Sequence, residues 1–262
     1  MSNIERAPRG VDPSKPNSAR VYDYLLGGRS HYTTDRVLAE QMVRIAPDIQ
    51  ATAAAHRQFL LQAVLLAAEA GVRQFLDIGA GIPTSPAVHE MAHKVDEGAR
   101  VVSVDHDPVV HAHATAFLSG VPGVIPLLAD VRRADELVER LRAERLIDFA
   151  EPVAILLGGV IHYVMDTEHP DRIHARFREV MAPGSYLILT HATDDTVRDF
   201  RDLATQSVGG SAQFAYRTRA EVEKFFEGFD LLGPGVTPVQ QWLDARAAVP
   251  PVVIVGGVGR RP

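Results

Sequence analysis

The chain has 262 residues, of which 46% are hydrophobic and 23% charged, a balance typical of a globular protein with one large core. Its net charge of −6 predicts no nucleic-acid partner, and the absence of cysteine excludes disulfides, thiolate catalysis and cysteine-ligated zinc. No apolar run reaches the roughly 20 residues of a membrane helix, and the polar N-terminus lacks the apolar core of a signal peptide, so we expect a cytoplasmic protein without membrane contact.

The first 71 residues precede any regular alternation of elements. Residues 1–17 hold three prolines and no apolar periodicity, which predicts a mobile leader. A short helix is expected from Ser18 and breaks at the pair Gly27 and Gly28, and an Ala/Leu-rich helix over 51–70 ends at Gly71. We expect residues 18–71 to form an N-terminal helical lid segment.

From residue 72 onward, short apolar runs alternate with helical patterns. Runs of Val, Ile and Leu without polar alternation predict parallel strands that are covered on both faces, and repeated strand–helix–strand units imply right-handed crossovers. The sequence therefore predicts an α/β core over 72–262, a doubly wound, mostly parallel sheet of seven strands. The expected strands are 74–78, 100–104, 124–128, 152–157, 185–190, 229–232 and 251–256, and the expected helices between the first five are near 86–97, 108–119, 133–145 and 168–182.

The loop after the first strand is the most informative motif of the chain. Asp77 lies in that strand, the loop contains Gly79, Ala80 and Gly81, and a second acid, Asp105, ends the next strand. Glycines allow the backbone to approach a ligand closely, and the second acid is placed to bind ribose hydroxyls.

The rest of this loop indicates which nucleotide it suits. A dinucleotide fold has a third glycine where backbone N–H groups meet the diphosphate. Here that position is Thr84, and the preceding Pro83 has no N–H. The loop therefore favours a ligand without phosphate, and S-adenosylmethionine is the predicted cofactor, with Gly79 and Gly81 along its aminocarboxypropyl arm. Asp77 is placed either to orient this loop or to meet the ammonium group of the cofactor. A tight turn without any ligand is the alternative.

Two further strand ends carry candidate site residues. After the third strand, Asp130 can accept the adenine amino proton and Val131 can pack on the ring, although Asp130 also suits a helix N-cap. After the fourth strand, Gly158 precedes His162, which is placed either to take a proton from an acceptor or to shape the pocket. His191 is a weaker candidate of the same kind.

Residues 89–93 read His-Glu-Met-Ala-His and match the zinc-protease signature. On a helix, His89 and His93 share a face, and Glu90 is placed as the base. The sequence offers no third ligand in the expected downstream helix, so we expect no metal site here and interpret the motif as a surface helix.

Three segments of the chain resemble a bacterial family of S-adenosylmethionine-dependent methyltransferases formerly classed as a domain of unknown function. They are residues 19–28, 74–84 and 104–110, and the resemblance extends from about Ser18 over nearly the whole chain. It implies a class I, Rossmann-like methyltransferase fold, bound S-adenosylmethionine with S-adenosylhomocysteine as product, and an N-terminal segment that folds over the cofactor. Within that segment, Tyr22, Gly28 and His31 are implied in cofactor contacts.

The chain departs from the pattern of this family at several positions. Asparagine is expected in the family where this sequence has His31, His56 and His106, and again near Ala87. His106 follows the ribose-binding acid and is placed to stack on adenine. Imidazole can replace an amide as donor or acceptor, so binding can survive, while the lid contacts or the acceptor pocket can differ.

These observations predict a methyltransferase that acts on a small molecule, with residues 192–217 forming part of the acceptor wall. One rival uses S-adenosylmethionine but transfers or cyclises its aminocarboxypropyl arm. Another is a cofactor-sensing protein without turnover. A nicotinamide enzyme is disfavoured by Pro83 and Thr84.

Overall fold

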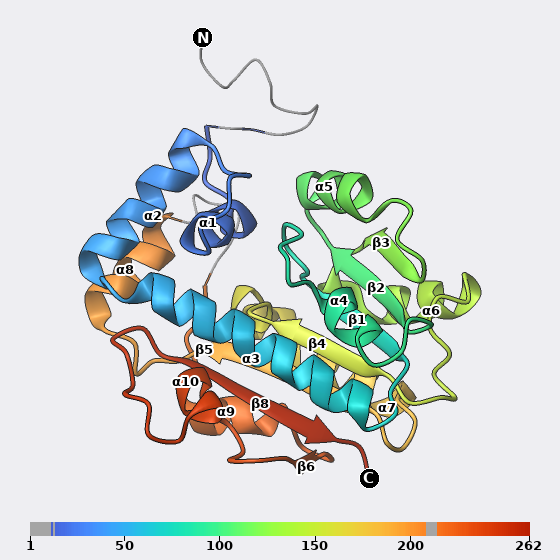
Figure 1. Ribbon diagram of the computed structural model, residues 1–262. Coiled ribbons are helices and arrows are strands. Elements are labelled where there is room, and N and C mark those ends of the chain that lie inside the picture. Colours follow the sequence, from blue (N-terminus) through green and yellow to red (C-terminus); the bar gives the residue numbers. More distant parts are fainter. Residues whose placement is uncertain (1–11, 13, 208–213) are drawn as a thin grey trace.

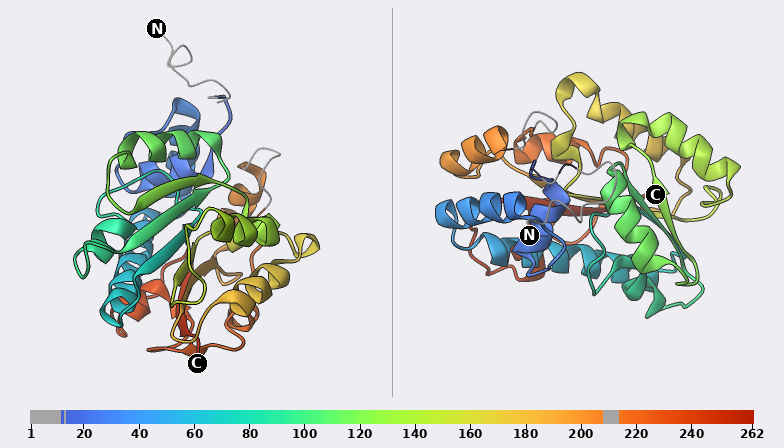
Figure 2. Two further views of the ribbon diagram at one scale, coloured as in Figure 1. Left: turned by 90° about the vertical axis from the view of Figure 1, so that its right-hand side faces the viewer. Right: turned by 90° about the horizontal axis from the view of Figure 1, so that it is seen from above.

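The chain forms one mixed sheet with helices on both faces, as a computed structural model shows for residues 12, 14–207 and 214–262 (Figure 1, Figure 2). The strands are β1 (Gln74–Ile78), β2 (Arg100–Asp105), β3 (Val124–Leu128), β4 (Ala154–Gly158), β5 (Tyr186–Ala192), β6 (Asp230–Leu231), β7 (Thr237–Pro238) and β8 (Ile254–Arg260). Their order is β3-β2-β1-β4-β5-β8-β6, with β7 paired to β8. Strands β1 to β5 are parallel and β8 is antiparallel to β5. The predicted doubly wound, mostly parallel sheet is confirmed.

The C-terminal strands differ most from the prediction. The last strand begins at Ile254 rather than at Pro251, because the ladder with β5 starts where Ile254 faces Ala192. The strand that was not predicted is β7, a two-residue pairing of Thr237 and Pro238 with β8. It is too short to leave a periodic pattern in the sequence. Five predicted strands and the observed β1 to β5 differ by at most two residues at either end.

Helices cover the two faces of the sheet because adjacent strand residues point to opposite sides. Phe75 packs on one face with Phe59 and Val64, whereas Leu76 packs on the other with Leu137. The first face is covered by α3, α4, α5 and α10, and the second by α6, α7 and α9. Their bounds are α3 (Ile49–Glu69), α4 (Val88–His93), α5 (Pro108–Leu118), α6 (Ala134–Ala143), α7 (Pro170–Val180), α9 (Arg219–Lys224) and α10 (Val239–Leu243).

The N-terminal helices α1 (Ser18–Leu25) and α2 (Thr33–Ile45) form a third apolar cluster with α8 (Arg198–Ser207). A buried ion pair joins α1 to α2, with Arg20 Nε 2.7 Å from Asp35 Oδ2. Helix α8 lies in the stretch 192–217 that the sequence pattern left without a helix. It forms because Phe200, Leu203 and Ala204 recur at helical spacing and pack on this cluster.

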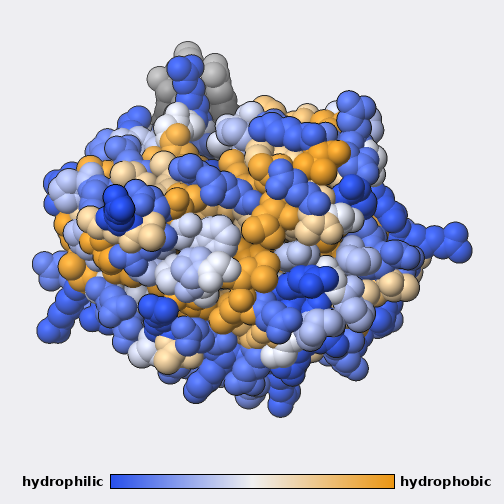
Figure 3. Space-filling view, turned by 60° about the horizontal axis from the view of Figure 1, so that its bottom comes forward, coloured by the Kyte–Doolittle hydropathy of each residue, from blue (hydrophilic) through white to orange (hydrophobic). Residues whose placement is uncertain are grey.

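Two sequence-based expectations concern the ends and the surface. Residues 1–11 and 13 lie outside the described residues, and with them most of the predicted leader. Among the described residues, no helix is both long enough and apolar enough to span a membrane. Figure 3 shows a band of apolar residues across one face, framed by hydrophilic ones, and such exposure of apolar atoms is usual for folded domains.

Candidate active site

The β1 loop is held against β2 by its own backbone. The N–H groups of Gly79 and Ala80 donate to the carbonyl of Val104 at 2.8 and 3.1 Å. Gly79 and Gly81 have φ values of +68° and +67°, which favour glycine. The surroundings of the two glycines differ: a Cβ on Gly79 would lie 2.2 Å from Val160 Cγ2, whereas a Cβ on Gly81 would meet nothing within 4 Å. The space beside Gly81 is therefore open to a ligand.

Asp105 connects this loop to the start of α5. Its Oδ2 accepts the Gly81 N–H at 3.0 Å, and its Oδ1 accepts the Asp107 N–H at 2.9 Å. Asp107 in turn caps α5 and accepts a hydrogen bond from the side chain of Asn17, just before α1. The acid predicted to bind ribose thus fixes the glycine loop, and the N-terminal segment reaches the same strand edge.

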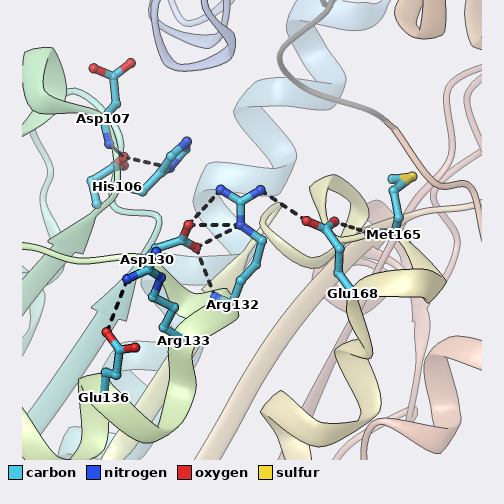
Figure 4. Close-up of polar contacts among 9 residues, drawn as sticks. His106, Asp107, Asp130, Arg132, Arg133, Glu136, Met165 and Glu168 are labelled. Carbon is cyan, nitrogen blue, oxygen red and sulfur yellow. Dashed lines mark hydrogen bonds and ion pairs between the residues drawn. The ribbon is translucent and has the colours of Figure 1, made fainter.

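His106 projects from this edge with 65% of its side chain exposed (Figure 4). Its Nδ1 lies 3.6 Å from Asp105 Oδ1. The hydrogen bond and charge of Asp105 raise the pKa of His106 above its ordinary value, against partial burial. The imidazole is free to lie along a flat ligand beside Asp105.

A narrow cleft runs along the other side of the glycine loop, lined by Asp77, Gly81, Thr84 and Arg57 among others. Burial raises the pKa of Asp77 to about 6, opposed by the positive charge of Arg57. Arg57 comes from α3, and its guanidinium donates to the carbonyls of Thr84 and Pro86 at 2.9 and 2.7 Å. Its Nε is buried without a partner among the described residues. The cleft is therefore lined by one carboxylate, that of Asp77, and by one cation, Arg57.

Asp130 follows β3 and is engaged by Arg132 (Figure 4). Its Oδ1 accepts the Arg132 N–H at 3.0 Å as the N-cap of a short 3-10 helix, Val131–Arg133, and its Oδ2 lies 2.7 Å from the Arg132 guanidinium. These contacts lower the pKa of Asp130. Arg132 also reaches Glu168 at 3.3 Å. The N-cap role that the sequence left open is present, and Val131 is buried in the core.

A buried chain of hydrogen bonds connects α1 to the turn after β4. The Tyr22 hydroxyl lies 2.7 Å from His56 Nδ1, and His56 Nε2 lies 2.8 Å from Thr190 Oγ1. Thr190 Oγ1 also accepts the N–H of Gly159, which has a φ of +70°. Burial lowers the pKa of His56 to about 4, so the ring is neutral near pH 7. Gly158, before this turn, is needed because a Cβ there would lie 2.7 Å from Leu60.

His162 lies beyond that turn in the 3-10 helix Ile161–Tyr163 and is 7% exposed. Its ring stacks on Phe214 at 4.5 Å and meets His191 edge-on at 5.5 Å. Burial and the neighbouring His191 hold the pKa of His162 well below its ordinary value, and its Nδ1 has no partner among the described residues. His162 is therefore a neutral, buried imidazole with one unpartnered ring nitrogen.

His191 has a different role from the one considered for it. Its Nε2 accepts from Arg217 at 2.8 Å and its Nδ1 lies 2.7 Å from the Ala192 carbonyl. Arg217 also donates to the carbonyls of Ile161 and Val164. Both ring nitrogens of His191 are thus engaged, and its Nε2 is connected through Arg217 to the turn that holds His162.

Residues of the turn that follows α1 bond to the end of that helix. Asp23 Oδ2 accepts the Ser30 N–H at 2.7 Å and lies 3.4 Å from His31 Nδ1. Gly28 has no room for a side chain, because a Cβ would lie 2.1 Å from Asp23 Oδ1. Gly28 and His31 therefore shape the turn that follows α1.

The zinc-like motif forms no metal centre among the described residues, where no group of three or more potential ligands occurs. Glu90 accepts from the Ala87 N–H and the Ser85 hydroxyl, and His93 Nε2 lies 2.9 Å from the Ala99 carbonyl. The acid of the motif therefore caps helix α4, and one histidine connects the end of this helix to the residue before β2.

The comparisons with known proteins decide the family. The model of a family described as S-adenosyl methyltransferase matches residues 4–262. The chain belongs to the S-adenosyl methyltransferase family. The family resemblance predicted from the three segments is confirmed, and with it the enzyme class and S-adenosylmethionine as the cofactor.

Solved structures agree with this assignment. A protein from Thermobifida fusca YX is 37% identical, with 97% of this chain and 98% of that chain covered and a TM-score of 0.85. A DUF574 family protein from Streptomyces avermitilis MA-4680 is 32% identical, with 96% and 99% covered and a TM-score of 0.87. N-methyltransferase NodS from Bradyrhizobium japonicum WM9, solved with S-adenosyl-l-homocysteine, is 14% identical with a TM-score of 0.52 over 93% and 99%, and shows only the shared fold. None of the curated proteins compared with the chain matches it.

Two residues of the candidate site carried no clear signal in the sequence. Arg57 and Glu69 are the only acidic or basic residues of α3 apart from a histidine, so an arginine in an Ala/Leu-rich helix was the available signal for Arg57. Thr190 gave no signal, because a threonine at the end of a buried strand is an ordinary strand residue.

Proposed function

We propose that this methyltransferase binds S-adenosylmethionine across the carboxyl ends of β1, β2 and β4 and methylates a small molecule. The observation that carries the proposal is the open space at Gly81, bordered by Asp77 and Arg57 on one side and by Asp105 on the other. Gly81 has a positive φ, and no described atom would clash with a side chain there. This is consistent with a loop that lacks side chains so that a ligand can approach its backbone.

The cleft along the loop fits the zwitterionic amino acid end of the cofactor. Asp77 is the partner for the ammonium group, and the free Nε of Arg57 is the partner for the carboxylate. Burial raises the pKa of Asp77 to about 6, and an ammonium group bound beside it would favour the charged carboxylate. The sequence placed Asp77 either to orient the loop or to meet this ammonium group, and Arg57 is added here as the partner for the carboxylate.

The adenosine end is assigned to the neighbouring strand ends. Asp105 already accepts two backbone N–H groups and retains lone pairs for the ribose hydroxyls. The exposed His106 ring is placed to cover adenine. Asp130 and Val131 remain proposed adenine contacts, although Arg132 occupies much of the Asp130 carboxylate and Val131 is buried.

The N-terminal segment is proposed to cover the cofactor. Asn17 contacts the Asp107 side chain, and Tyr22 reaches the β4 turn through His56 and Thr190. In this arrangement Tyr22, Gly28 and His31 act through the shape of the cover. Residues 18–71 then divide into the cover, α1 and α2, and a layer of the core, α3.

Transfer requires the protein to exclude water and to align the acceptor atom. When bound, the cofactor supplies a methyl group on a sulfonium with a good leaving group. The buried His162 beyond the Gly158–Gly159 turn is the proposed recipient of an acceptor proton, because its Nδ1 has no partner among the described residues and carries a lone pair in one tautomer of the neutral ring.

Calorimetric titration of S-adenosylhomocysteine tests the cofactor site. Asp105→Asn replaces one of the two oxygens with an amide, so we expect affinity to fall about 10- to 150-fold, the value of a hydrogen bond to a charged group. Asp244→Asn, a change at the end of α10, is the matched control and should leave affinity unchanged. Equal affinities of the two variants would contradict the proposal.

Product analysis tests the reaction itself. The purified enzyme, incubated with S-adenosylmethionine and candidate acceptors, should release S-adenosylhomocysteine. Methylthioadenosine would instead indicate transfer of the aminocarboxypropyl arm, and tight cofactor binding without product would indicate a sensor.

A further inference from the structure

Four aromatic side chains lie ring to ring beyond the carboxyl end of β4. His162 and Tyr163 come from the 3-10 helix after that strand, and Phe214 and Tyr216 come from the segment before α9. The His162 and Phe214 rings stack at 4.5 Å, Tyr163 meets the edge of His162 at 4.5 Å, and Phe214 lies 4.6 Å from Tyr216. We call these four residues the aromatic cluster.

The aromatic cluster contains two buried polar atoms without a partner among the described residues, His162 Nδ1 and the Tyr216 hydroxyl. A buried polar group without a hydrogen bond is unfavourable and calls for an explanation, such as a water molecule, an ion or a ligand that binds there. By contrast, both ring nitrogens of the neighbouring His191 are engaged. Within the aromatic cluster, the unpartnered atoms therefore belong to His162 and Tyr216.

The scaffold around the aromatic cluster is fixed and adjoins the proposed cofactor site. The Ala215 N–H donates to the His162 carbonyl at 2.8 Å, and Arg217 holds the same turn through Ile161 and Val164. A Cβ on Gly159 would lie 3.4 Å from His162 Cε1, so the cluster directly follows the bare turn of β4. His162 is buried, whereas the other three rings are half-buried and form a rim.

We propose that the aromatic cluster is the acceptor site and that the acceptor is a flat aromatic molecule carrying a hydroxyl or amino group. This inference rests on the proposed methyl transfer and names its substrate class. Flat rings stack favourably on the faces and edges of Phe214 and Tyr163. The protic group then bonds to His162 Nδ1, and the Tyr216 hydroxyl bonds to the same oxygen or nitrogen atom.

The bond changes balance with these groups alone. The acceptor oxygen or nitrogen supplies the electron pair for its new bond to the methyl carbon, and the electrons of the broken carbon–sulfur bond stay on sulfur. The acceptor proton passes to the lone pair of His162 Nδ1, which requires the tautomer that carries its hydrogen on Nε2.

Ligand-observed NMR titrations of the full chain test the substrate class with three probes: naphthalen-2-ol, naphthalene and decahydronaphthalen-2-ol. With S-adenosylhomocysteine present, we expect naphthalen-2-ol to bind about three- to tenfold more tightly than either comparison probe, because only it combines the flat ring with the hydrogen bond. Tyr216→Phe should lower its affinity by a similar factor, while the control Tyr186→Phe, in the core on the other face, should not.

The outcomes separate this inference from the proposed function. Removal of an unpartnered hydroxyl should leave the fold intact, and a thermal melt checks this. If the saturated alcohol binds as well as naphthalen-2-ol, or if Tyr216→Phe binds it as the wild type does, the aromatic acceptor site is wrong. The S-adenosylhomocysteine titration is read independently, and the probes are also titrated without it, so a failure of the cofactor site leaves the aromatic preference measurable.

Discussion

Gly81→Ala is the sharpest perturbation of the cofactor site, because it adds one methyl group to the space on which the proposal depends. The backbone there has a φ of +67°, and the new Cβ would have no neighbour within 4 Å. In the free protein, the substitution therefore costs only the left-handed backbone conformation, roughly 1–2 kcal/mol of unfolding free energy.

The cost to cofactor binding is separate from this backbone cost. The strained φ is present in the free and the bound protein, so it cancels in the dissociation constant. What remains is the collision of a methyl group with a ligand that lies against the loop, about 1–3 kcal/mol by analogy with overpacking. The dissociation constant for S-adenosylhomocysteine should therefore rise about 5- to 150-fold.

Gly235→Ala is the matched control for this substitution. Gly235 also has a positive φ, +76°, and open space around its Cβ position, but it lies in the turn between β6 and β7. Urea denaturation should show similar losses of stability for the two variants, and calorimetry should show a loss of affinity only for Gly81→Ala. Unchanged affinity of Gly81→Ala would refute the placement of the cofactor along this loop.

Further variants test the buried polar groups. Thr190→Val leaves the Gly159 N–H and His56 without their partner and should cost about 1–3 kcal/mol in urea denaturation, whereas Thr190→Ser should cost less; equal losses would exclude the hydrogen bonds as the cause. His174→Phe should raise the free energy of unfolding, because neither ring nitrogen of His174 has a partner among the described residues. Burial lowers the pKa of His174 to about 3, so the wild type loses stability as pH falls from about 6.5. The gain in unfolding free energy should therefore be larger at pH 5 than at pH 7. The pKa of Asp77, raised to about 6, makes the ligand-free wild type less stable as pH rises from about 4 to 6. Asp77→Asn should therefore raise the free energy of unfolding more at pH 7 than at pH 4, and a gain that does not depend on pH would argue against the raised pKa.

The sequence predicted the parts of the fold that depend on local pattern. Apolar runs that carry no polar alternation identified β1 to β5, and the loop after β1 was recognised from its glycines and from Pro83. Helix α8 was missed, because its apolar residues follow one face of a mostly polar helix. Strand β7 was missed because a two-residue pairing depends on β8 and leaves no signal of its own.

Roles at the site were harder to predict than positions. Asp105 was expected to bind ribose, which stays a prediction, and the structure shows that it bonds the glycine loop. Asp130 was left between an adenine contact and an N-cap, and the N-cap contact is present. A side chain at a strand end can serve both the loop and a ligand, and the residue type alone does not distinguish these uses.

Local sequence thus determined the order of the elements, the bare loop and the acids at the strand ends, because hydrophobic period and glycine placement act over a few neighbouring residues. Only the tertiary structure decided which distant groups meet. Arg57 of α3 meets Asp77 of β1, and Phe214 stacks on His162 from 52 positions further along the chain. Such meetings are set by how the layers pack on the sheet, which no single segment of the sequence records.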